Sequence, residues 1–89
     1  MHTGEFLAQS RLDAEALHAW IEAGWLRPSE SRSGREFSDI DLARARLIAN
    51  LRGDLGINDE AVAVVLDLID QIHGLRRLVR ELLDRRHPQ

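Results

Sequence analysis

The stretch LHAWIEAGWLRP, residues 17–28, contains the end of a helix and the start of a loop. Leu17, Trp20 and Ile21 are spaced three and four residues apart, so they share one face of a helix. Gly24 follows them, and glycine readily adopts the left-handed conformation that ends many helices. The stretch therefore predicts an amphipathic helix that stops at Gly24 and leads into a loop.

The start of this helix is marked by Asp13, whose carboxylate can accept hydrogen bonds from the free backbone N–H groups of a helix beginning at Ala14. Before it we expect a short first helix, capped by Thr3, with Phe6 and Leu7 as its apolar contacts. Two short helices thus precede the loop.

After Gly24 the chain enters the segment RPSESRSGRE, residues 27–36, which is rich in proline, serine and glycine. This composition predicts a loop or a small hairpin with Gly34 near its tip. Ser38 and Asp41 then resemble a capping box at the start of a third helix. The apolar positions expected in that helix, which should end near Gly56, are Ile40, Ala43, Leu47, Ile48 and Leu51.

A long fourth helix is expected from Asp59 to Arg86, capped by Asn58. Its first half has a broad apolar arc that suits packing on the earlier helices. Its second half narrows to a stripe with the alternating spacing of three and four that marks a coiled-coil seam. The stripe is Val65, Leu68, Ile72, Leu75, Val79 and Leu82. Its C-terminal members, Ile72, Leu75, Val79 and Leu82, are our candidates for contact with a second copy of the chain.

Charge is unevenly distributed along this helix. Four acids and no arginine lie between residues 57 and 72, whereas five arginines follow residue 73. The four acids are Asp59, Glu60, Asp67 and Asp70. The helix dipole accounts for acids in the first turn but not for Asp67 and Asp70. Such acids are either a solvated surface or a face for a basic partner.

Composition limits the classes of function. The 89 residues suit one folded unit, with a winged-helix-like part at 1–56 and the long helix at 57–89 packing on it. A net charge of −3 is unlike the basic footprint of nucleic-acid binders. Without cysteine, a catalytic triad, a phosphate loop or a metal cluster, we expect neither an enzyme nor a cofactor. The longest apolar run, residues 61–66, is far too short to cross a membrane.

The order of helix, turn, helix, wing and helix resembles the winged helix-turn-helix domain of MerR-type regulators. This resemblance implies a mainly all-α fold with a small wing and a long C-terminal helix. The residues that carry it are framework positions: Leu17, Trp20, Gly24, Leu26, Arg27, Pro28, Gly34, Phe37, Ser38, Asp41 and Leu42.

A more specific resemblance is to the chaperone-modulator CbpM family. It rests on Glu5-Phe6, on LRP at residues 26–28 and on INDEAVAVVLDLIDQIHGL at residues 57–75. This resemblance implies a cytoplasmic, non-enzymatic protein that binds the J-domain of a DnaJ-like co-chaperone, CbpA, and blocks its stimulation of a DnaK-type chaperone. J-domains engage such chaperones through a basic helix face. The four acids of the long helix are therefore the candidate J-domain site.

The alternative is a minimal MerR-like transcriptional regulator. In the MerR pattern the second helix has Arg where this chain has His18, and Tyr where it has Ala19. The wing has Tyr and Arg where this chain has Arg35 and Glu36. His18 and Arg35 are the DNA-contact candidates under this alternative, but Glu22 and Glu36 would repel phosphate. The pattern favours a chain that has kept the MerR-like fold but binds a partner other than DNA.

Overall fold

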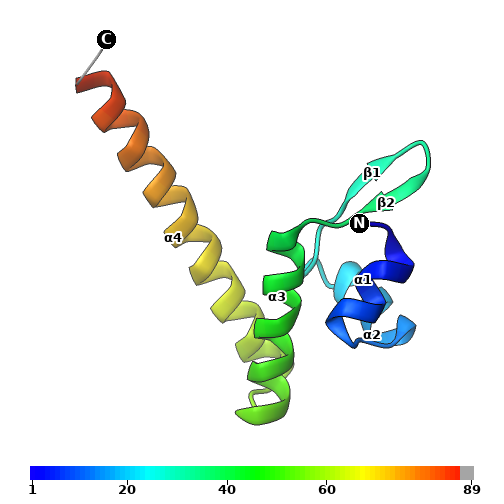
Figure 1. Ribbon diagram of the computed structural model, residues 1–89. Helices are drawn as coiled ribbons and strands as arrows, with labels where there is room; N and C mark the ends of the chain where they lie inside the picture. Colours follow the sequence, from blue (N-terminus) through cyan, green and yellow to red (C-terminus); the bar gives the residue numbers. More distant parts are fainter. Residues whose placement is uncertain (87–89) are drawn as a thin grey trace. The chain divides into compact units, whose positions relative to one another are not determined.

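A computed structural model describes residues 1–86, so the last three residues of the expected segment 57–89 lie outside the described part (Figure 1). The chain divides into two compact units, which meet between Asn58 and Asp59. In chain order, the elements are α1 (Thr3–Ser10), α2 (Ala14–Glu22), β1 (Ser29–Ser31), β2 (Gly34–Glu36), α3 (Asp39–Ala49), the π-helical turn η1 (Asn50–Asp54) and α4 (Asp59–Arg86). The expected mainly helical class is confirmed.

Helix α1 begins at Thr3, and the expectation that Thr3 caps it is wrong. The capping position is His2, whose side chain makes no capping hydrogen bond. Phe6 is fully buried and stacks on Phe37, with the ring centroids 4.2 Å apart. Burial of this aromatic pair, rather than a cap, therefore holds α1 in the first unit.

Helix α2 has the predicted boundaries. The Asp13 carboxylate accepts a hydrogen bond of 2.7 Å from the backbone N–H of Ala16. At the other end, the N–H of Trp25 donates to the carbonyl of Trp20, and the N–H of Gly24 donates to that of Ile21. These two bonds, with a φ of 78° at Gly24, form a Schellman motif.

The hairpin between α2 and α3 is also present. Strands β1 and β2 pair antiparallel, with Ser31 opposite Gly34. A φ of 113° at Gly34 places that glycine beside the two-residue turn, as the sequence predicted. The strand end is fixed to the start of the chain because the N–H of Phe37 donates to the carbonyl of Met1 at 2.8 Å.

Helix α3 starts with the predicted capping box. The N–H of Asp41 donates to the Ser38 hydroxyl, and the N–H of Ser38 donates to the Asp41 carboxylate at 2.9 Å. The expected apolar face is partly wrong, because Ile40 is 78% exposed and Ala43 is exposed too. The buried row is Leu42, Ala45, Ile48 and Leu51.

The end of α3 widens into the π-helical turn η1. The N–H of Leu55 donates to the carbonyl of Asn50, and the N–H of Ile57 donates to that of Leu51. Gly56 has a φ of 64°, so the helix ends at the predicted glycine.

Helix α4 runs without interruption from Asp59 to Arg86, as predicted, and Gly74 does not break it. Val62 and Leu66 are buried, whereas Leu68, a member of the predicted seam, is 53% exposed. Nothing lies within 4 Å of a Cβ built at Gly74, so no neighbouring segment approaches that glycine closely. No helix in residues 1–86 has both the length and the apolar character needed to cross a membrane.

Candidate functional site

The four acids singled out in the sequence all lie in the first half of α4, and all four are exposed. At about 100° of rotation per residue, they fall within an arc of about 100° of the helix surface. We call Asp59, Glu60, Asp67 and Asp70 the acidic face. The structure thus places the predicted partner-binding residues on one side of one helix.

The acidic face has the properties of a surface for a basic partner. Its carboxylates are open to solvent, and the segment that carries them contains no arginine. An exposed ion pair contributes about 0–1 kcal/mol, so binding by one such carboxylate would be weak. Several carboxylates of one sign on one face raise the encounter rate with a cationic partner and exclude anionic ones.

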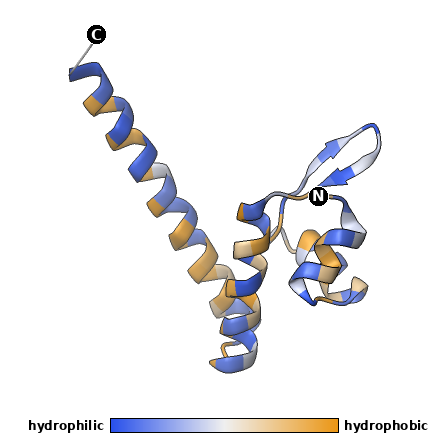
Figure 2. Ribbon diagram, viewed as in Figure 1, coloured by the Kyte–Doolittle hydropathy of each residue, from blue (hydrophilic) through white to orange (hydrophobic). Residues whose placement is uncertain are grey.

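The second half of α4 carries the four residues predicted to contact a second copy. Ile72, Leu75, Val79 and Leu82, which we call the apolar stripe, are 47%, 61%, 53% and 50% exposed. Figure 2 shows hydrophobic and hydrophilic positions alternating along the whole of α4. The structure therefore leaves these four side chains in contact with solvent in the single chain.

Two further apolar residues beside the stripe did not follow from the spacing rule. Leu78 is 51% exposed and Leu83 is 50% exposed. Both fall next to the positions of the regular three-and-four repeat, on either side of it. The sequence signal for both residues is a leucine at a heptad position that flanks the repeat.

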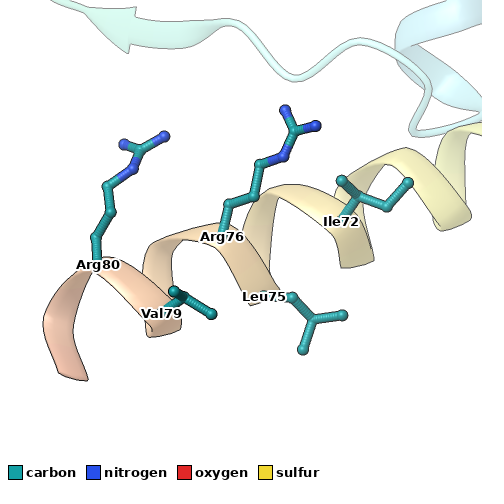
Figure 3. A pocket seen from close by; sticks show the side chains of 5 residues that line it. All are labelled: Ile72, Leu75, Arg76, Val79 and Arg80. Carbon is teal, nitrogen blue, oxygen red and sulfur yellow. The ribbon is translucent and has the colours of Figure 1, made fainter. Parts of the chain in front are cut away.

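An open hollow follows the stripe on the surface of α4. Ile72, Leu75 and Val79 line it together with Arg76 and Arg80, and Figure 3 shows the two arginine side chains extending side by side. The hollow combines an apolar floor with a cationic edge. Its lining comes from a single helix, so it is open on the other side in the single chain.

The DNA-contact candidates of the alternative reading lie on separate elements. His18 is exposed on α2, where Glu15 and Glu22 are exposed as well. Arg35 is half-buried on β2, directly opposite Glu30 in the strand register. Exposed carboxylates therefore lie beside each candidate. Within residues 1–86, no group of three or more His, Cys, Asp or Glu side chains could hold a metal ion.

Comparisons with known proteins give a consistent family. The family model described as MerR HTH family regulatory protein matches residues 1–84. Proteins named Chaperone modulatory protein CbpM, from Coxiella burnetii strains Dugway 5J108-111 and RSA 331 / Henzerling II, are 32% identical to the chain over 72 residues. The matched region covers 80% of this chain and 68% of each relative. No solved structure gave a significant match.

Proposed function

Because this chain belongs to the MerR helix-turn-helix family, and within it to the chaperone-modulatory CbpM proteins, we propose that it regulates a chaperone by binding a co-chaperone J-domain. The partner is the J-domain of a DnaJ-like protein of the CbpA type. Binding prevents this J-domain from stimulating its DnaK-type chaperone. The protein acts by occupying a surface in the cytoplasm and catalyses no reaction itself.

The observation that carries this proposal is the acidic face of α4. A competitor for a basic J-domain surface needs exposed negative charge on a rigid element, and Asp67 and Asp70 supply it beyond the first turn. On α2, the exposed His18 lies between two exposed acids, Glu15 and Glu22. The charge of both helices thus suits a cationic protein better than a phosphate backbone.

A homodimer formed through the apolar stripe is the second part of the proposal. Of the half-exposed apolar side chains in α4, seven that lie on or beside the apolar stripe each leave on the order of 100 Å² open and would bury about 1,400 Å² over two copies. That area reaches the lower end of stable interfaces. The seven side chains are Leu68, Ile72, Leu75, Leu78, Val79, Leu82 and Leu83.

The proposed J-domain site is tested with the double variant Asp67→Lys/Asp70→Lys. Inverting two contact charges should weaken binding to the J-domain about tenfold or more, since unpaired like charges at an interface are costly. Isothermal titration calorimetry measures the affinity, and J-stimulated ATP turnover by the DnaK-type chaperone reports the inhibition.

The matched control is Glu81→Lys/Asp84→Lys, which makes the same charge change on the same helix outside the acidic face. It should bind the J-domain like the unmodified chain. Equal binding by both double variants would reject the acidic face as the site. Failure of the unmodified chain to lower J-stimulated ATP turnover would reject the proposed function.

A MerR-like DNA-binding role is the second candidate, supported by the family match over residues 1–84. A DNA binder should shift duplex DNA at low salt and lose affinity steeply as salt rises. Saturable, sequence-selective duplex binding at about 0.15 M salt, reduced by His18→Ala/Arg35→Ala, would favour this role over J-domain binding.

A further inference from the structure

The first two residues of the chain lie against the base of the hairpin, where β2 leads towards α3 (Figure 1). The Met1 nitrogen donates to the carbonyl of Phe37 at 2.8 Å, and the N–H of Phe37 donates back to the carbonyl of Met1 at 2.8 Å. Facing residues of an antiparallel sheet exchange hydrogen bonds in this reciprocal way. Met1 therefore continues the hairpin sheet by a single residue.

Side-chain contacts reinforce this backbone pair. The two oxygens of Glu36 contact different groups, since Oε1 lies 3.2 Å from His2 Nδ1 and Oε2 lies 3.4 Å from the Met1 nitrogen. The next residue, Phe37, stacks on Phe6 of α1. We call Met1 and His2 the N-terminal strap. Two consecutive residues at the base of the hairpin thus hold both the strap and the helix that follows it.

The N-terminal strap combines a buried anchor with an exposed clamp. The side chain of Met1 is 9% exposed, whereas those of His2 and Glu36 are 59% and 40% exposed. Exposed ion pairs contribute little to the stability of a whole domain. A small contribution is nevertheless enough to shift a local equilibrium between a closed and an open segment.

We propose that the N-terminal strap opens locally while the first unit stays folded, and that Glu36 holds it closed. In the closed state the base of the hairpin is fixed to the start of α1. In the open state the N–H and carbonyl of Phe37 lose their partners, and this edge of the hairpin is exposed. Phe6 and Phe37 remain stacked in the core in both states. Glu36 acts through Met1 and His2, so it is a positioning residue.

Hydrogen exchange measured by NMR on the full chain tests the opening, because it resolves single amides. The Phe37 amide is bonded to the strap, whereas Ile48 is a buried residue of α3 and serves as the reference. Local opening exposes little surface, so low concentrations of urea should leave exchange at Phe37 unchanged and accelerate exchange at Ile48.

The role of Glu36 is tested with Glu36→Gln. Loss of exposed ion pairs should lower the protection factor of the Phe37 amide about two- to fivefold. The matched control is Glu30→Gln, the same change on β1 at a residue that faces Arg35 in the strand register. It should leave the protection of Phe37 unchanged, because open and closed states of the strap both keep that pairing.

A double-mutant cycle with His2→Ala tests whether Glu36 acts through the strap. Because His2→Ala and Glu36→Gln remove the same contact, their combined effect on the protection of Phe37 should be smaller than the product of the single effects. Independent effects would overturn the proposal. It would also be overturned if Glu36→Gln left Phe37 as protected as before, or if Phe37 and Ile48 responded equally to urea.

Discussion

Gly24 is the residue on which the turn from α2 towards the hairpin depends. Its φ of 78° lies in the left-handed region, and its N–H completes one of the two hydrogen bonds that end the helix. Those bonds bring Trp25 back to Trp20, and both indoles are buried with their ring centroids 6.2 Å apart. The backbone of one glycine thus positions the larger aromatic pair of the first unit.

We expect Gly24→Ala to lower the free energy of unfolding by about 1 kcal/mol, and Gly24→Asn to lower it less, because asparagine tolerates the left-handed region. Nothing lies within 4 Å of a Cβ built at Gly24, so the loss comes from the backbone and not from a clash. Urea unfolding measures the difference.

The control for that change is Gly4→Ala in α1. This glycine has no left-handed φ, and a Cβ there also meets nothing within 4 Å. Alanine in a helix should therefore raise stability by up to about 1 kcal/mol. If both substitutions shifted the urea midpoint in the same direction, the left-handed requirement at Gly24 would be refuted.

Among the elements, α3 shows what local sequence predicts and what it does not. The capping box of Ser38 and Asp41 is a contact between residues three apart, so the sequence identified it. The buried face depends on what the helix packs against, and the small Ala45 gave no signal of being a core position. Ile40 is large and apolar but lies in the first turn, where it stays exposed.

For the candidate surfaces of α4 as well, the sequence predicted the features that depend on local spacing and missed others. The sequence placed the acids and the apolar stripe on one long helix, since the spacing of residues is a local property. It gave too narrow a stripe because Leu78 and Leu83 stand outside the regular repeat.

Gly74→Ala should stabilise α4 by about 1 kcal/mol, because glycine is the weaker helix former and a Cβ at that position has free space. Gly74 points about 120° away from the apolar stripe, so the substitution should not change the oligomeric state. The thermal midpoint and light scattering test both expectations. A lower midpoint would mean that another segment, such as one from a second copy, approaches Gly74 closely.

In the molecule as a whole, the charge of α4 separates the two proposed contacts. Residues 59–72 carry acids without arginine, and the five arginines of α4 follow residue 73. Arg76 and Arg80 edge the hollow beside the apolar stripe, whereas the carboxylates of the acidic face lie on the earlier half. Under the proposed function, the basic surface of a J-domain would therefore be attracted to the first half of α4 and repelled by the second half.

The exposure of residues 71–86 also has a consequence for the stability of the helix itself. Every residue in that range is exposed, so the described side chains of this half of α4 bury little surface in the single chain. Isolated helices of about 15 residues are marginal in water. Backbone amides there should exchange with deuterium within seconds in the variant Leu75→Asp/Leu82→Asp, whose new charges should oppose pairing through the apolar stripe, and far more slowly in the unmodified chain. Rapid exchange in both would show that this half frays freely and that no second copy protects it.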